Sequence, residues 1–198
     1  REQVKVICMD LSSPFRSVVQ RLFPRARIVA DRFHVIRLII DTFHEFCKAV
    51  DPEIKWKRGI TCALRTKGVN LRPAQRLLLE KEFSGHPAIQ TAYDFKEELC
   101  TLLSIKERKR ANCIPLLERL KEMVWQMLHE APEIFKKLGR TIRQWFEPII
   151  RMWRFTKSNG ITEGFHRKMK LIQRRAYGYR NFQNYRLRVL IECGHIVI

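Results

Sequence analysis

The fold is decided by the stretch VKVICMD, residues 4–10, together with the stretch ARIVAD, residues 26–31. Each is a short apolar run, largely β-branched, that ends in an aspartate, and this is typical of a buried strand. Neither run alternates apolar with polar residues, which favours parallel strands covered on both faces. Between them Ser12 and Ser13 precede Pro14, the signal for a helix start. The sequence therefore predicts a β-α-β unit ending at Asp31.

Helical patterns dominate the sequence that follows. A helix is predicted from Phe33 to about Val50, and a basic, loop-like stretch with Gly59, Gly68 and Pro73 comes next. Further helices are predicted at residues 73–83, 87–104, 115–130 and 132–156. We expect the tryptophans of this region to be core residues, namely Trp125, Trp145 and Trp153. These helices are interpreted as an all-α insertion.

The last part of the chain has a different character. A turn and cap signal at residues 157–160 precedes a helix that opens at Thr162-Glu163, and a final amphipathic helix is predicted from Phe182 to Ile191. Between Glu163 and Glu192 there are eight Lys or Arg and no acidic residue. We expect Phe182 and Leu187 to be packed, and Arg174, Arg175 and Arg180 to be exposed.

The charge of the chain indicates a polyanionic partner. Its 39 Lys and Arg against 20 Asp and Glu give a net charge of +19. Nucleic acid is the expected partner, because each neutralised phosphate releases a condensed counterion. A membrane is not expected, since no apolar run approaches the roughly 20 residues that a spanning helix needs. The six cysteines show no C-x-x-C pair and are expected to be reduced.

Three acidic residues are candidates for chemistry. Asp10 and Asp31 each end a predicted parallel strand, at the sheet edge where ligands gather in α/β folds. On neighbouring strands they could share a cation, or each could simply cap the helix that follows. Glu163 precedes His166, Arg167 and Lys170 at helical spacing. It could belong to a solvated ion-pair face, or be an acidic ligand for Mg²⁺ or Mn²⁺ in a phosphate-binding surface.

Several motifs in a fixed order resemble the bacterial insertion-sequence transposases of the ISL-three family. They are MDLSSPF at residues 9–15, FPRARIVADRFHV at 23–35, SNGITEGF at 158–165 and RRAYGYRNF at 174–182. The resemblance runs from about Val4 to Ile191. It implies a ribonuclease-H-like core with an Asp-Asp-Glu triad and a helical insertion before the Glu.

On that resemblance the chain is α/β by architecture but mostly α by content. Residues 1–50 would be the first part of a partial ribonuclease-H-like core, 51–156 the helical insertion, and 157–198 the C-terminal core helices. The resemblance implies that Asp10 and Glu163 are catalytic ligands of Mg²⁺ or Mn²⁺. It gives supporting roles to Asp31, Arg32 and His34, although His34 could also be an ordinary packed residue.

The basic surface of the C-terminal helices is expected to bind DNA, both transposon ends and target. Guanidinium groups grip phosphates, and exposed aromatic rings can stack on unpaired bases. The residues expected to carry this binding are Arg167, Lys168, Lys170, Arg174, Arg175 and Arg180. The resemblance also implies a homo-oligomer at synapsis and a bacterial cytoplasmic, nucleoid-associated protein.

The resemblance implies that the first Asp of the family's triad lies on a strand well upstream of Asp10 and before Arg1. Glu2 lies too early in its own strand to replace it. On this expectation the parent protein cuts and joins DNA, and the present chain alone is inactive. An alternative from another class is a catalytically incomplete basic DNA-binding or assembly module. A third possibility takes Asp10, Asp31 and Glu163 as a self-sufficient triad.

Overall fold

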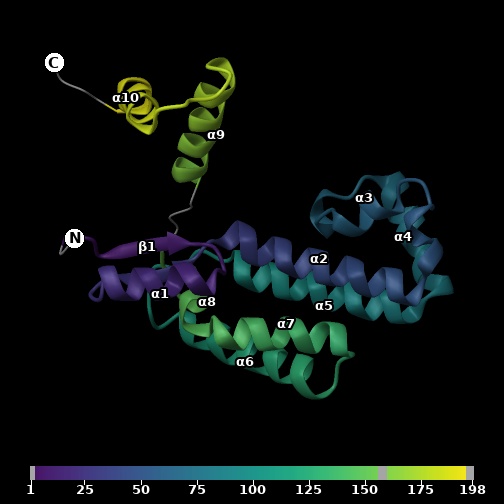
Figure 1. Ribbon diagram of the computed structural model, residues 1–198. Coiled ribbons are helices and arrows are strands. Elements are labelled where there is room, and N and C mark those ends of the chain that lie inside the picture. Colours follow the sequence, from purple (N-terminus) through teal and green to yellow (C-terminus); the bar gives the residue numbers. More distant parts are fainter. Residues whose placement is uncertain (1–2, 156–159, 195–198) are drawn as a thin grey trace. The chain divides into compact units, whose positions relative to one another are not determined.

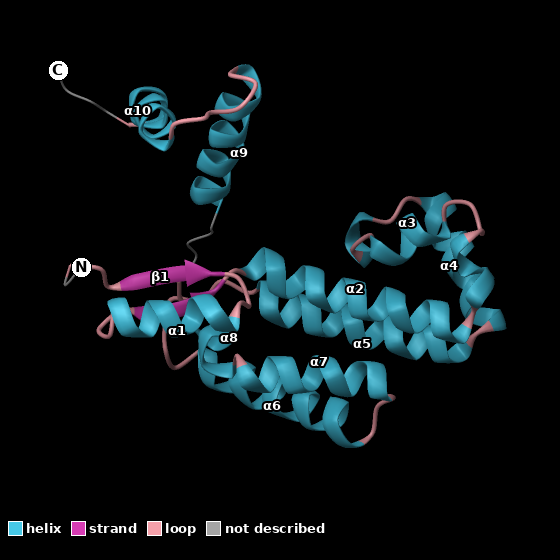
Figure 2. Cartoon of the chain, viewed as in Figure 1, coloured by secondary structure: helices cyan, strands magenta, loops and turns pink. Residues whose placement is uncertain are grey.

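A computed structural model describes residues 3–155 and 160–194 (Figure 1). Glu2 and the predicted turn signal at 157–159 lie outside these residues. The chain divides into two compact units, residues 1–157 and 158–198, and each is described by itself. Most of the described residues are helical, and a two-stranded parallel sheet stands at the start (Figure 2).

The first unit opens with the predicted β-α-β arrangement. Strand β1 covers Val6–Met9, helix α1 Ser13–Leu22 and strand β2 Arg27–Ala30. The strands are parallel and paired from Val6 with Arg27 to Met9 with Ala30. Two neighbouring parallel strands are therefore confirmed. A larger ribonuclease-H-like core remains a prediction.

Helices make up the rest of the first unit. The α-helices are α2 Arg32–Val50, α3 Ile60–Arg65, α4 Pro73–Gly85, α5 Pro87–Ser104, α6 Cys113–His129, α7 Glu133–Gln144 and α8 Phe146–Arg151. Two 3-10 turns, η1 Pro52–Lys55 and η2 Gly68–Asn70, flank α3. Helix α2 packs along α5 and also contacts α7, whereas α6 pairs with α7 (Figure 1). The core of the unit lies among these helices.

Two predictions on this region were wrong. The loop-like stretch after Val50 contains the short helix α3, which buries Ile60, Ala63 and Leu64. The single helix expected over 132–156 is broken at Trp145. Pro148 explains the break, because it lacks the N–H that a continuous helix would need and is tolerated only in a first turn, where α8 places it.

Two of the three tryptophans are core residues, as predicted. Trp145 and Trp153 are buried, and the Trp153 indole donates to the carbonyl oxygen of Leu102 at 3.0 Å. Trp125 was predicted wrongly, since it is 53% exposed and stacks on His129 one turn later in α6. Helical spacing alone does not tell which face of α6 meets α7.

The helices of the first unit are fixed to the sheet by arginines. Arg151 of α8 donates to the carbonyl oxygen of Ile28 in β2 at 3.2 Å and pairs with Glu147. Helix α8 also packs against β2. The end of the predicted insertion therefore contacts the strand that leads to Asp31.

Buried thiols agree with the expectation of reduced cysteines. Cys47 in α2 and Cys100 in α5 lie in the core. Burial raises the pKa of Cys47 to about 12 and that of Cys100 to about 11. Both thiols are therefore protonated at neutral pH and chemically inert.

The second unit is a pair of helices, α9 Gly160–Arg175 and α10 Phe182–Cys193. Helix α9 begins two residues before the predicted start. It ends in a Schellman arrangement, in which Tyr177 N–H donates to Arg174 and Gly178 N–H donates to Gln173. Tyr177 has φ 51° and Gly178 has φ 97°. For a non-glycine residue this left-handed conformation costs roughly 1–2 kcal/mol.

Candidate active site

Two aspartates lie at the carboxyl edge of the two-stranded sheet. Asp10 and Asp31 directly follow Met9 and Ala30, the last paired residues of β1 and β2. The Asp31 N–H donates to the carbonyl oxygen of Met9 at 2.7 Å, which extends the ladder by one bond. Neighbouring strands lie about 4.8 Å apart, so the aspartates occupy matching positions at one edge.

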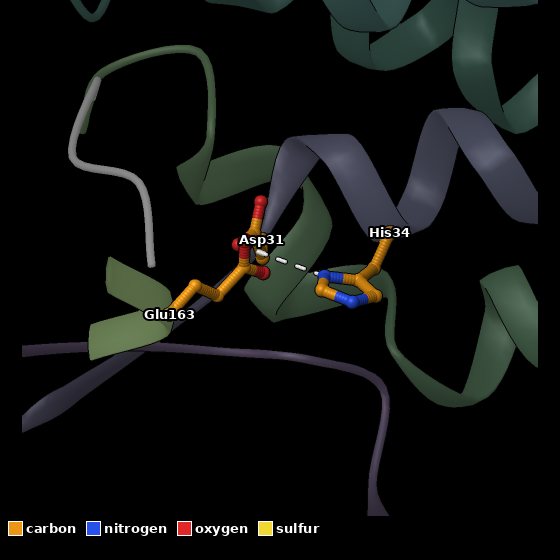
Figure 3. A group of neighbouring side chains, drawn as sticks. All are labelled: Asp31, His34 and Glu163. Carbon is orange, nitrogen blue, oxygen red and sulfur yellow. Dashed lines mark ion pairs between the residues drawn. The ribbon is translucent and has the colours of Figure 1, made fainter. Parts of the chain in front are cut away.

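Asp31 is held in place by the start of α2. One carboxylate oxygen accepts the N–H of Phe33 at 2.9 Å, and Asp31 is the N-cap of the helix. The other oxygen lies 3.6 Å from Nδ1 of His34 (Figure 3). Asp31 is only 3% exposed. The capping interpretation is thus correct for Asp31, and the cap also aims its second oxygen at His34.

Asp10 differs from Asp31 in its bonding. The N-cap of α1 is Ser12, not Asp10, and only the backbone carbonyl of Asp10 accepts a bond there, from Ser12 N–H at 2.9 Å. Within the described residues, the half-buried carboxylate of Asp10 has no hydrogen-bond or ion-pair partner. The capping interpretation is therefore wrong for Asp10, and its carboxylate remains available for a ligand.

Arg32 is committed to backbone carbonyls. Its guanidinium donates to Ile105 at 3.2 Å and to Met152 at 2.5 Å, the residues that follow α5 and α8. Burial lowers the pKa of Arg32 from its ordinary value. A cation is stabilising at helix C-termini, where carbonyls are otherwise unpaired. Arg32 thus ties the start of α2 to two helices that are distant in sequence, a contact that no sequence pattern indicated.

Glu163 lies in the first turn of α9, where a negative charge is favourable. It forms no ion pair with His166, Arg167 or Lys170 among the described residues, so the ion-pair interpretation is not realised. Positions 163, 167, 170 and 174 follow the spacing i, i+4, i+7, i+11 and share one face of the helix. At 1.5 Å per residue this face extends about 16 Å.

We call Arg167, Lys170 and Arg174 the basic stripe of α9. All three are exposed and, among the described residues, have no ion-pair partner. Arg175 and Arg180 are likewise exposed and unpaired in this part of the chain. Lys168 differs, because its ammonium group contacts the backbone carbonyl of Glu192 in α10. Five of the six predicted DNA-binding residues therefore present unpaired cations.

Two apolar residues of α10 that were predicted to be packed are exposed. Phe182 is 67% exposed and Leu187 is 56% exposed, although both were expected to be packed. Phe182 lies 6.3 Å from the ring of Tyr185, and Tyr185 lies 5.3 Å from Tyr179. A two-helix unit has too little volume to enclose all the apolar residues of an amphipathic pattern.

A second group of ionisable residues lies within the predicted insertion and was missed by the sequence reasoning. Asp51, Glu82 and His86 bring their ligand atoms within 4.8 Å of one another. The Lys57 ammonium lies 2.8 Å from Oδ2 of Asp51 and 2.8 Å from Oε2 of Glu82, and His86 lies 3.0 Å from Oε1 of Glu82. Lys57 therefore already places one positive charge between the two carboxylates of this cluster, which joins η1 to α4.

Replacing Lys57 by methionine is expected to lower the free energy of unfolding by about 2 kcal/mol. The substitution leaves two buried carboxylates together without a cation, which costs about 3–5 kcal/mol in a fully buried pair. The smaller value applies because the Lys57 side chain is 39% exposed. Urea unfolding at pH 7 measures the loss. Lys121→Met, which removes an exposed pair with Glu118, is the control and should cost less than about 0.5 kcal/mol.

The free energy of unfolding that Lys57→Met loses should depend on pH. The hydrogen bond from Lys57 holds the pKa of Asp51 below its ordinary value of 3.8. The stabilisation is therefore fully present above 3.8 and is lost as the pH falls through the lower, folded-state value. A difference between Lys57→Met and the parent chain that stays constant into this acid range would contradict the assignment.

The chain belongs to the ISL-three family of DDE transposases, since the family model described as Transposase matches residues 1–189. This family of DNA-processing enzymes is the one that the motifs predicted. The transposase for insertion sequence element IS1001 of Bordetella parapertussis is 22% identical over 202 residues, covering 95% of this chain and 47% of that protein. No solved structure matches the chain.

A second similar protein carries a different name. A Lactococcus lactis subsp. lactis protein named ATP-dependent protease is 26% identical over 121 residues, covering 61% of this chain and 36% of that protein. The family model covers residues 1–189, whereas the similarity to that protein covers 61% of the chain, so the family assignment follows the transposase model. The chain spans about half the length, or less, of these curated relatives. Within the described residues, no helix is both long enough and apolar enough to cross a membrane.

Proposed function

We propose that this chain is part of the catalytic domain of a DNA transposase that cleaves and joins strands by phosphoryl transfer, with Asp10 and Glu163 as metal ligands. The observation that carries the proposal is the unpartnered, half-buried carboxylate of Asp10 beside Asp31 at the sheet edge. A carboxylate held partly away from water without a partner is unfavourable. A bound divalent cation would offset that cost.

The donor set fits a hard cation. Carboxylate oxygens are the ligands that Mg²⁺ and Mn²⁺ prefer, and no thiol is required. When bound, such ions supply Lewis-acid stabilisation and lower the pKa of an attacking hydroxyl. Asp10 and Glu163 would hold the ion. Asp31 and His34 would act as positioning residues, because one carboxylate oxygen of Asp31 already accepts the N–H of Phe33 and caps α2.

The basic stripe gives Glu163 a substrate-binding surface. Arg167, Lys170 and Arg174 continue the face on which Glu163 stands. A DNA strand whose phosphates follow this stripe would bring one phosphate to the first turn of α9. The arginines would grip phosphate oxygens by charge-assisted hydrogen bonds and fix the strand for in-line attack.

The proposal is tested with the full-length transposase and a labelled duplex that carries one end of its element. Mg²⁺ should produce strands with new 3′-hydroxyl ends, and a duplex with a scrambled end should stay intact. Cleavage without added divalent metal, in the presence of a chelator, would overturn the metal-dependent assignment. The expected homo-oligomer can be followed in the same reactions by sedimentation of the protein with two DNA ends.

The second candidate function is a basic DNA-binding or assembly module without catalysis of its own. The excess of unpaired cations on α9 and on the turn after it favours DNA binding whether or not catalysis occurs. Incubating this chain by itself with nicked and intact duplex in Mn²⁺ distinguishes the two. We expect binding without turnover, and turnover would instead support Asp10, Asp31 and Glu163 as a self-sufficient triad.

A further inference from the structure

The turn between α9 and α10 carries one aromatic ring that is fully exposed to solvent. Tyr177 is 101% exposed. The other aromatic residues of this segment contact each other, with Tyr179 packed on Tyr185 and Phe182 near the same ring. Among the described residues, the Tyr177 ring forms no aromatic or cation–π pair. In the Tyr-Gly-Tyr motif, Tyr179 is therefore packed against another ring, whereas Tyr177 is fully exposed.

The backbone at Tyr177 would suit glycine better. Its φ of 51° is left-handed, and this position at a helix C-terminus is usually taken by glycine. The turn is closed by backbone bonds alone, from Tyr177 N–H to Arg174 at 3.1 Å and from Gly178 N–H to Gln173 at 3.0 Å. A side chain at this position thus costs backbone strain, and within the described residues the exposed ring makes no aromatic or cation–π contact that would offset it. Strained residues cluster at functional sites, so this conformation motivates a search for a function of the ring.

The charge around the ring indicates which partner it meets. Arg174, Arg175 and Arg180 flank Tyr177 and are exposed, and no acidic residue occurs between Glu163 and Glu192. A flat exposed ring among guanidinium groups is the arrangement that binds unpaired bases, because the arginines hold the backbone phosphates while the ring stacks on a base. A protein partner would need a complementary acidic surface around an aromatic pocket.

We propose that Tyr177 stacks on an unpaired base of the DNA, next to phosphates held by Arg174, Arg175 and Arg180. Every base has an aromatic face, so the contact selects for unpaired structure and not for sequence. The inference rests on the proposed function only in taking DNA as the ligand. It requires neither a metal nor strand cleavage. The site would recognise a DNA end or junction where pairing is already broken.

The test compares two labelled duplexes that differ only in one unpaired adenine. Fluorescence anisotropy gives the Kd of this chain for each probe at the same salt concentration. The parent chain should bind the unpaired probe about tenfold more tightly, the size expected for one stacked base. Tyr177→Gly should abolish that preference, and Tyr177→Phe should keep it. Arg175→Gln should weaken both probes by the same factor, since phosphates are present in each.

Thermal unfolding separates stacking from a structural role. Tyr177→Gly should leave Tm unchanged or raise it, because glycine adopts the left-handed conformation without strain. A lower Tm, or a preference for the unpaired probe that survives the substitution, would overturn the proposal. The proposal would also be overturned if Tyr177→Gly changed the oligomeric mass of the chain and weakened binding to both probes equally. That result would place the ring in a contact between protein chains. Absence of cleavage by the full-length protein would refute the proposed function and leave this comparison intact.

Discussion

Asp10→Asn in the full-length transposase is expected to lower Mg²⁺-dependent DNA end cleavage by about a thousandfold or more. Asparagine keeps the shape of the side chain but removes the charge that attracts a hard cation. A loss of about 4 kcal/mol in transition-state stabilisation corresponds to this factor and is within the several kcal/mol that a metal ion contributes. Gel analysis of end-labelled duplex measures the rate.

Folding and DNA binding should survive this substitution. The Asp10 carboxylate has no internal partner in the described part of the chain, so its loss breaks no contact. Asp41→Asn is the matched control, because Asp41 is an exposed aspartate of α2 whose ion-pair partners, within the residues that the structure describes, are Arg37 and Arg65. It should cleave at the parent rate. Cleavage by Asp10→Asn within tenfold of the parent would remove Asp10 from the site.

Neutralising the basic stripe should have the largest effect on binding. The triple variant Arg167→Gln, Lys170→Gln and Arg174→Gln removes three phosphate contacts, so the slope of log K against log salt should become shallower by about three. Affinity for duplex DNA near 0.1 M salt should fall about a hundredfold or more. Titration of this chain with duplex at several salt concentrations gives both numbers.

The control for this variant must change the net charge equally. Arg119, Lys121 and Arg140 are cations of the first unit that already pair with Glu98, Glu118 and Glu133. Replacing all three by glutamine should leave the salt slope nearly unchanged, because charges neutralised by the protein release few counterions on binding. An equal loss in both triple variants would show that overall charge alone, not the stripe, determines DNA affinity.

Local sequence signals predicted the β-α-β start well. The apolar runs before Asp10 and Asp31 correctly gave two neighbouring parallel strands, because buried strands carry their signal in consecutive residues. The caps were less predictable. Both aspartates precede helices, yet only Asp31 caps one. The difference arises because Ser12, two residues after Asp10, takes the N-cap position of α1, whereas Asp31 itself takes that position in α2.

Contacts between distant residues could not be predicted. Arg32 bonds carbonyls 73 and 120 residues away, and Lys57 bridges Asp51 to Glu82, which lies 25 residues after Lys57. No periodicity encodes such pairs. The exposure of Trp125 was missed for the same reason, since only the packing of α6 against α7 decides which of its apolar residues are buried. The motif at residues 174–182 was recognised, but the strain and exposure of Tyr177 appear only in three dimensions.

Direct metal ligation by Asp10 is the central claim, and a metal switch tests it most directly. Asp10→Cys replaces a hard oxygen ligand by a sulfur that binds Mn²⁺ better than Mg²⁺. End cleavage by the full-length Asp10→Cys protein should be lost in Mg²⁺ and partly restored in Mn²⁺, raising the Mn²⁺-to-Mg²⁺ rate ratio at least about tenfold above that of the parent. An unchanged ratio, with activity either kept or lost equally in both metals, would contradict ligation by Asp10.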